Sequence, residues 1–154
     1  MVKNVFKKLG KKQKNNKGFS LVELIVVIAI MAVLVGVLAP QLIKYVEKSR
    51  EATDIQTCDN IATALKTYYA DEEVAASATT TTTVTVTLGK TELGTAADTA
   101  VKDAGLTKAK IKGTKWTGDK ITIVYNKADG TITYTGDSPY YHSDKDQFKK
   151  GPKS

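Results

Sequence analysis

Residues 17–30, KGFSLVELIVVIAI, place one carboxylate, Glu23, inside an otherwise apolar run. Glu23 is the only charged residue between Phe19 and Ile43, and residues 24–39 are apolar throughout. At a helical rise of about 1.5 Å per residue, residues 19–43 are long enough to cross the hydrocarbon core of a membrane. An acidic side chain near the middle of a bilayer costs about 2.5 to 3.5 kcal/mol, so a carboxylate in such a run is expected to have a function.

The basic charge of the chain is concentrated before this run. The chain has 154 residues, a size suited to one domain, and a net charge of +7. Residues 1–18 contain seven lysines and no acidic residue, and the remaining 16 basic residues are balanced by 16 acidic ones. By the positive-inside rule the N-terminus stays in the cytoplasm and the chain beyond the apolar run faces outward. We predict no nucleic-acid partner, because a basic DNA-binding arm is not normally followed by a membrane span.

Three interpretations of the apolar run remain open. It is a cleaved secretory signal if Val37 and Ala39 form the small-residue cleavage pattern, although Pro40 would then follow the cut and the hydrophilic leader is long for that class. It is an uncleaved signal anchor in the second interpretation, which explains the length and the lysines and leaves the carboxylate unexplained. The third interpretation takes Gly18 and Phe19 as a junction between a basic leader and a hydrophobic helix.

The third interpretation rests on a family resemblance. A glycine that ends a short basic leader, an aromatic residue that opens an apolar helix, and Glu23 four residues later resemble the signature of type IV pilins and the related pseudopilins. The resemblance implies that a prepilin peptidase removes residues 1–18 by cutting after Gly18, and that the new amine of Phe19 is N-methylated. In many Gram-negative members of the family a disulfide closes the C-terminal region. The chain has one cysteine, so its pattern is that of a Gram-positive-type pilin without this disulfide.

Under this interpretation Glu23 acts with Phe19 in subunit assembly. The two residues are one helical turn apart, so the carboxylate is able to neutralise part of its own terminus. The resemblance implies a second partner, the Phe19 amine of the neighbouring subunit in a filament. Because a buried ion pair mainly fixes register, Glu23 is expected to specify axial stagger more than to add stability. The alternative is a glutamate that only extends toward the headgroups from near the helix start.

Beyond residue 43 the pattern changes from uniformly apolar to amphipathic. Small and apolar residues recur every three or four positions among polar ones that include Glu51 and Asp54, and they are Ala52, Ile55, Cys58, Ala62, Leu65 and Tyr69. We therefore predict one helix over about residues 19–73, with an apolar half at 19–43 and an amphipathic half at 44–76 that packs on a head. A kink or local melting is expected between Gly36 and Pro40, because proline removes a backbone donor and glycine weakens a helix.

The head is predicted over residues 77–136. The threonine run at 79–83 is either a β-prone polar loop or a glycosylated one. Strands are expected at 84–88, 112–117, 121–126 and 131–135, with a short helix near 96–104 that has capping-box spacing at Thr95 and Asp98 and a stop at Gly105. The apolar set that covers the helix is Trp116, Ile121, Ile123, Tyr125, Ile132 and Tyr134. The predicted fold class is α+β: a long N-terminal helix on a small antiparallel sheet, followed by a surface tail at 137–154.

The chain offers little for catalysis or metal binding. It has one histidine, His142, and one cysteine, Cys58, which is expected to be a buried structural thiol. Asp137, Asp144 and Asp146 are possible oxygen ligands for calcium, but no complete ligand loop surrounds them, and solvated turns are favoured. The tyrosine pairs at 68–69 and 140–141 are expected to pack in the core or at an interface. We predict no enzymatic activity, no cofactor and no metal.

The predicted function is therefore that of a structural subunit of a type IV pilus. The resemblance implies a single-pass prepilin in the cytoplasmic membrane with its head outside, then a helical homopolymer in an extracellular filament with a role in adhesion, motility or biofilm. It also implies three further partners: a prepilin peptidase, a membrane platform protein and a cytoplasmic assembly ATPase. Two alternatives remain, a pseudopilin of a type II secretion or DNA-uptake system and a signal-anchored binding module that does not polymerise.

Overall fold

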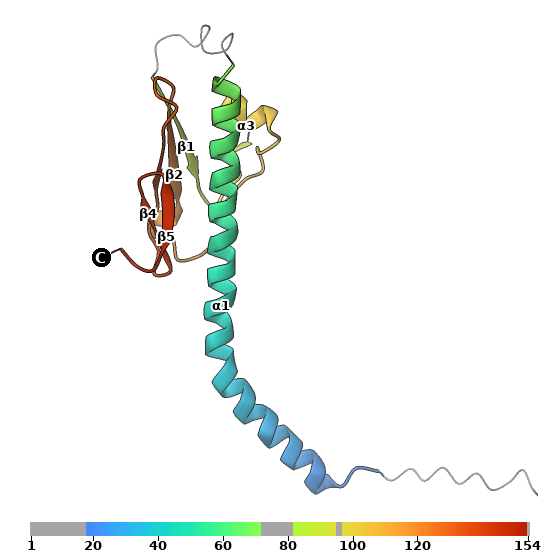
Figure 1. Cartoon of the computed structure of the whole chain (residues 1–154). Coiled ribbons are helices and arrows are strands. Elements are labelled where there is room, and N and C mark those ends of the chain that lie inside the picture. The colour runs from blue at the N-terminus through green and yellow to red at the C-terminus, as the bar shows by residue number, and fades with distance from the viewer. Residues whose placement is uncertain (1–17, 72–81, 95–96, 154) are drawn as a thin grey trace, which may run out of the picture. The chain divides into compact units, whose positions relative to one another are not determined.

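The computed structural model describes residues 18–71, 82–94 and 97–153 (Figure 1). The chain divides into two compact units, Met1–Pro40 and Gln41–Ser154, and each is described by itself. The elements are α1 (Leu21–Tyr69), β1 (Thr83–Leu88), α3 (Thr99–Asp103), the 3₁₀ turn η2 (Thr117–Asp119), β2 (Ile121–Asn126), β3 (Ile132–Thr135), β4 (Tyr141–Asp144) and β5 (Gln147–Lys150). The α+β class predicted from the sequence is confirmed.

The described part of the first unit is the apolar start of α1. Its side chains are exposed from residue 18 onward, and only Ala39 is half-buried. The helical conformation continues through Gly36 and Pro40. Melting between these two residues in a filament therefore stays a prediction about the assembled state.

The second unit is a head in which the remainder of α1 packs against an antiparallel sheet. The strand order is β1-β2-β3, with Val86 opposite Ile123 and Ile123 opposite Tyr134. Strand β2 alternates buried and half-buried residues, as expected for a strand with one face in the core. The fully buried side chains include Cys58, Ile61 and Leu65 of α1 and Leu88, Val101, Ile121 and Ile123 of the head.

The short helix α3 begins at Thr99, three residues after the predicted start near 96, and ends at Asp103, one residue before the predicted end at 104. Asp98 is the N-cap, and its carboxylate accepts a 3.0 Å hydrogen bond from the Ala100 N–H. At the other end Gly105 has φ of +72°, and the Leu106 N–H donates to the Val101 carbonyl at 3.0 Å, which is a Schellman motif. Thr95 and residues 79–81 of the threonine run lie outside the described residues, and Thr83 of that run opens β1. Helix α1 ends at Tyr69 and is followed by the non-helical residues 70–71, so the predicted helix end near 73 is too far along the chain.

Two predicted features of the head are wrong. The strand predicted at 112–117 does not form, because the N–H groups of Lys112, Gly113 and Thr114 donate to carboxylates of α1 in place of a neighbouring strand. The segment 137–154 is not a surface tail, because β4 and β5 pair as an antiparallel hairpin. The Phe148 ring of this hairpin lies 5.7 Å from Trp116 and 5.1 Å from Tyr134 between centroids, so the hairpin is packed onto the core.

The side of α1 that faces the head also differs from the prediction at its N-terminal end. Glu51 and Asp54, taken from the sequence as polar positions outside the apolar stripe, are fully buried, and Ala52 is exposed. Buried carboxylates at 47, 51 and 54 continue the buried positions 58, 61 and 65 along one face of the helix. The sequence pattern is misleading here because a polar residue is expected to face water.

Candidate functional site

The junction predicted at Gly18 and Phe19 lies immediately before the first turn of α1. Ser20 precedes the helix, and its Oγ accepts a 3.4 Å hydrogen bond from the Val22 N–H. The Glu23 carboxylate accepts a 2.8 Å hydrogen bond from the Ser20 N–H in return. This reciprocal pair is a capping box, which satisfies two backbone donors at the start of the helix.

The capping box gives Glu23 a role that the residue pattern alone did not reveal. The signal was nonetheless present, since Ser20 and Glu23 have the S-x-x-E spacing of a capping box. The carboxylate lies in the first turn, where it also interacts favourably with the positive end of the helix dipole. Glu23 is therefore held at the end of the helix where cleavage after Gly18 would create the Phe19 amine.

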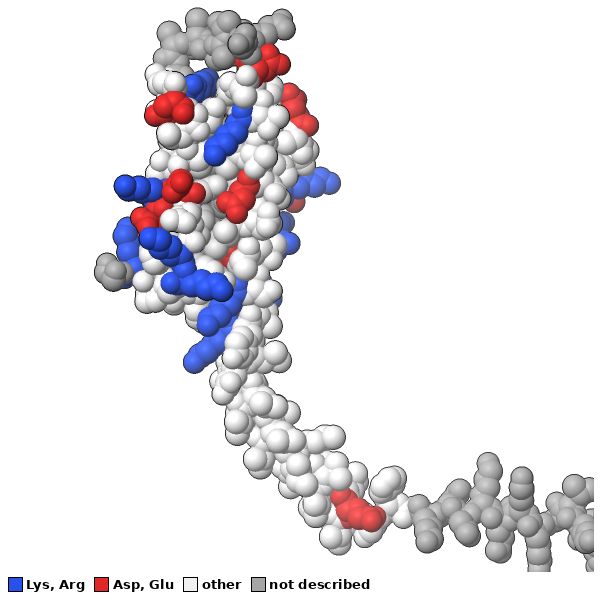
Figure 2. Space-filling model, in the orientation of Figure 1, with Lys and Arg blue, Asp and Glu red and all other residues white. Residues whose placement is uncertain are grey.

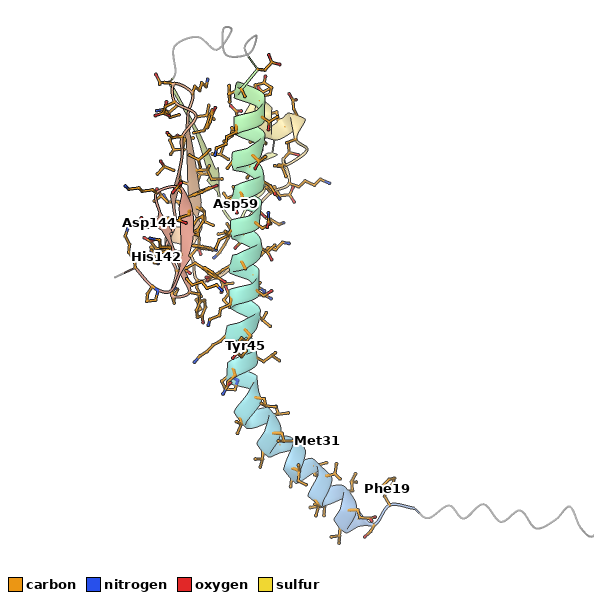
Figure 3. The ribbon with its side chains drawn as sticks, in the orientation of Figure 1. Phe19, Met31, Tyr45, Asp59, His142 and Asp144 are labelled. Atoms are coloured by element: carbon orange, nitrogen blue, oxygen red, sulfur yellow. The ribbon has the colours of Figure 1, made fainter. Side chains whose placement is uncertain are left out.

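The surface around this carboxylate is apolar. The Phe19 ring is 90% exposed, and an open groove is lined by Phe19, Val22, Glu23, Leu24, Val26 and Val27. Figure 3 shows Phe19 and Met31 projecting from the ribbon into solvent. In Figure 2 the apolar half of the helix is white apart from one acidic group near its start, which is Glu23. The helix is long and apolar enough to cross a membrane.

Gly36 and Pro40, predicted as the kink or melting point, lie several helical turns beyond this junction within α1. No residue surrounds Gly36 within 4 Å of an added Cβ. The structure thus places Gly18, Phe19 and Glu23 together at the helix start and leaves Gly36 and Pro40 apart from them.

A second polar cluster, which sequence reasoning missed, joins α1 to the head. Asp54 accepts hydrogen bonds from the Lys112 and Gly113 N–H groups at 2.7 Å each and from the Trp116 indole at 2.9 Å. Glu47 accepts from the Thr114 N–H. The two carboxylates thereby replace strand pairing for residues 112–116. No local signal marked them, because their donors lie 58 to 67 residues further along the chain.

Glu51 lies between these two carboxylates on the same helix face. Its Oε2 accepts a 2.5 Å hydrogen bond from the Ser138 hydroxyl, and its Oε1 is buried without a hydrogen-bond partner in the described structure. Burial raises the pKa of Glu51, and the neighbouring Glu47 and Asp54 carboxylates raise it further. Ser138 in turn accepts from the Tyr141 N–H at 3.0 Å, so this contact ties the start of the β4–β5 hairpin to α1.

Of the three aspartates considered for calcium, Asp146 is exposed and the other two are paired with lysines. The Asp144 carboxylate pairs with Lys149, whose hydrogen bond lowers the pKa of Asp144, and Asp137 lies 3.9 Å from Lys153. Figure 3 shows Asp144 and His142 on β4. His142 contacts the Gly151 carbonyl at 2.9 Å through Nδ1. Within the described residues no group of three or more acidic, histidine or cysteine side chains is placed to hold a metal ion.

The remaining candidate residues belong to the core. Cys58 is fully buried as predicted, and burial raises the pKa of its thiol. The Tyr69 ring stacks on Tyr125 at 5.7 Å, and its hydroxyl donates to Asp98 at 3.0 Å. Partial burial, together with that hydrogen bond, raises the pKa of Tyr69 to about 12. These contacts give Cys58 and Tyr69 structural roles.

Comparison with known proteins finds a family match at the start of α1. Residues 13–39 match the family of the prokaryotic N-terminal methylation motif. A 71-residue segment is 39% identical to "Prepilin peptidase-dependent protein A" of Clostridium perfringens (strain 13 / Type A), and it covers 44% of this chain. The chain spans 50% of the length of that curated relative. No solved structure matches the chain.

The chain thus combines an N-terminal helix that is long and apolar enough to cross a membrane with a match to the methylation motif at the start of that helix. Both matches support a type IV pilin-like protein.

Proposed function

We propose that the chain is a structural subunit of a type IV pilus, made as a membrane-anchored prepilin and polymerised through α1. The observation that carries the proposal is the exposed apolar surface of residues 21–46, which begins at the methylation motif and includes one carboxylate. Large contiguous apolar surfaces are rare on soluble monomers and mark membrane or protein contacts. Such a helix is stable in lipid, and it is equally stable among other helices of the same kind. The role is structural and not catalytic.

Processing is the first step of the proposed function. Gly18 and Phe19 are exposed and precede the helix, so a peptidase at the membrane surface has access to the bond between them. The similarity to a prepilin peptidase-dependent protein supports dependence on such a peptidase. Cleavage removes residues 1–18, and the new amine of Phe19 is the site of N-methylation.

Assembly is the second step. The capping box holds the Glu23 carboxylate at the helix start, and a carboxylate has room for further donors beside the Ser20 N–H. In the filament the methylated Phe19 amine of a neighbouring subunit is the second donor. A charge pair in apolar surroundings is costly to break, so this pair selects one axial stagger between subunits. Head-to-tail contacts of this type build open filaments.

The proposed partners and locations follow from these steps. Before assembly the protein crosses the cytoplasmic membrane once with its head outside, and after assembly it lies in an extracellular pilus. The energy for extraction from the membrane comes from a cytoplasmic ATPase that acts through a membrane platform protein. Adhesion, motility or biofilm formation is the role of the finished filament.

The intact mass of protein sheared from the cell surface tests this proposal. We expect the mass of residues 19–154 plus one methyl group. A Gly18→Val variant is the matched control: a side chain at Gly18 meets nothing within 4 Å, so the variant is expected to fold and to remain uncleaved in the membrane. Processed protein that stays in the membrane fraction and is never sheared off favours a pseudopilin. A wild-type chain that retains residues 1–18 overturns the proposal and leaves the anchored binding module.

A further inference from the structure

Three exposed basic side chains lie on α1 near the start of the second unit. Lys44 is the first charged residue after the apolar run, and Lys48 and Arg50 follow on α1. All three are exposed. In Figure 2 lysine and arginine side chains cluster over this end of the head, and acidic side chains are more frequent toward the other end.

The C-terminal hairpin adds two lysines to the same end. The Lys48 ammonium lies 5.3 Å from the centroid of the Tyr140 ring, and the Tyr140 carbonyl accepts a 2.7 Å hydrogen bond from the Gly151 N–H. Lys150 directly precedes Gly151 and pairs with Tyr141, so its backbone lies beside the segment whose Tyr140 ring Lys48 contacts, and its side chain is exposed. Lys153 follows two residues later. We call the set Lys44, Lys48, Arg50, Lys150 and Lys153 the basic surface.

The basic surface arises because acidic side chains of α1 are buried against the head. In the sequence, residues 44–51 alternate basic and acidic side chains and look nearly balanced. In the fold, Glu51 is fully buried against Ser138, and Glu47 is directed to the Thr114 N–H. The basic side chains on the other positions are left at the surface.

Two acidic groups partly offset the basic surface, and a positive excess remains. Glu47 lies 3.7 Å from Arg50, and Asp137 lies 3.9 Å from Lys153. Lys44, Lys48 and Lys150 have no carboxylate within ion-pair distance among the described residues. Each is thus available to an external anion.

We propose that the basic surface binds the anionic phospholipid headgroups of the outer leaflet while the protein is anchored in the membrane. Lys44 follows the apolar run after Ile43, and the helical residues 21–43 of that run extend about 34 Å, compared with about 30 Å of hydrocarbon core. Lys44 is therefore at headgroup depth, and lysines near an anionic leaflet are attracted to it within a Debye length. The contact holds the subunit at the membrane before it is extracted, and this inference rests on the proposed outward orientation of the head.

Amine footprinting in nanodiscs tests this inference. The full chain is reconstituted in nanodiscs of phosphatidylcholine alone or with 30% phosphatidylglycerol, and acetylation rates of individual lysines are measured by mass spectrometry. Adding phosphatidylglycerol is expected to slow labelling of Lys48 and Lys150 by roughly 3- to 10-fold, because each lysine contributes a modest attraction to the surface. Lys102 and Lys108, exposed lysines on and just after α3, are internal controls expected to label equally in both nanodiscs.

Two variants with the same change in charge separate local binding from general attraction. Lys48→Gln/Lys150→Gln should restore most of the labelling rate of Lys153 in the anionic nanodiscs, and Lys102→Gln/Lys108→Gln should leave Lys153 slowed. Slowing confined to Lys44, or equal slowing of all lysines, overturns the inference. Either result leaves the proposed pilus function untouched, because that function is judged by the mass of sheared filaments.

Discussion

Replacing Asp54 with alanine should destabilise the head more than any other single change of an acidic residue that we consider. The substitution leaves three donors without their acceptor: the N–H groups of Lys112 and Gly113 and the Trp116 indole. A buried donor left without a partner costs about 1 to 3 kcal/mol. The bond from Lys112 is partly exposed, so water replaces much of it, whereas the other two bonds are buried. The expected loss is therefore about 3 to 4 kcal/mol of the free energy of unfolding, mainly from two buried donors.

Trp116 allows a direct assay, because it is the only tryptophan and is buried. Its fluorescence is followed during urea unfolding of the full chain in neutral detergent micelles. At a slope of about 1.5 kcal/mol per molar urea, the midpoint should fall by roughly 2 to 2.5 M. Asp103→Ala is the control, since Asp103 is an exposed acid in α3, and its effect should stay within about 0.5 kcal/mol. A loss for Asp54→Ala no larger than that of the control would refute the role assigned to the buried carboxylate.

Three further predictions concern Glu51, Gly113 and Glu23. Burial raises the pKa of Glu51 in the folded head above its ordinary 4.5. The stabilising contribution of protonated Glu51 is therefore fully present below pH 4.5, and it is lost as the pH rises through the folded pKa. The difference in unfolding free energy between Glu51→Gln and wild type should therefore grow in favour of the variant as pH rises, and a difference that is constant with pH would contradict this assignment. In Gly113→Ala the new Cβ would lie 2.7 Å from Glu51 Cγ and 2.8 Å from Trp116 Nε1. The free energy of unfolding should therefore fall by about 1 to 3 kcal/mol, which the urea midpoint measures. Gly36→Ala, with open space around it, is the control, and equal midpoints for the two variants would exclude the predicted clash. Glu23→Gln keeps an acceptor for the capping box and removes the charge. Processed protein should still be detected by mass, and the amount of sheared filament should decrease sharply. Filaments at the wild-type level would show that the charge is not needed for assembly.

Much of the N-terminal half is predictable from the sequence because its signals are local. The apolar run and the junction at Gly18 and Phe19 are properties of consecutive residues, and they required no knowledge of the head. The strand over 121–126 was also predicted with the observed bounds, since its alternating pattern matches the pleat of a half-buried strand.

The errors share one cause, which is the use of polar side chains as internal partners. Residues 112–117 have the composition of a strand, yet the N–H groups of 112–114 donate to Asp54 and Glu47 of α1. The C-terminal segment is polar enough to suggest a tail, yet Ser138 bonds to Glu51 and Phe148 packs on Trp116. In each case the partner lies 32 to 87 residues away in the chain, beyond the reach of any local pattern.

The sequence by itself determined that this protein has a membrane-length helix, a basic N-terminal segment and a motif at the helix start, because charge and hydropathy along consecutive residues suffice for these properties. Only the tertiary structure decided which acids of α1 face the head. A carboxylate is stable in the interior when donors surround it, and those donors come together only when the chain folds. Burial of these acidic side chains leaves Lys44, Lys48 and Arg50 exposed, and it therefore also determines the charge of the exposed surface.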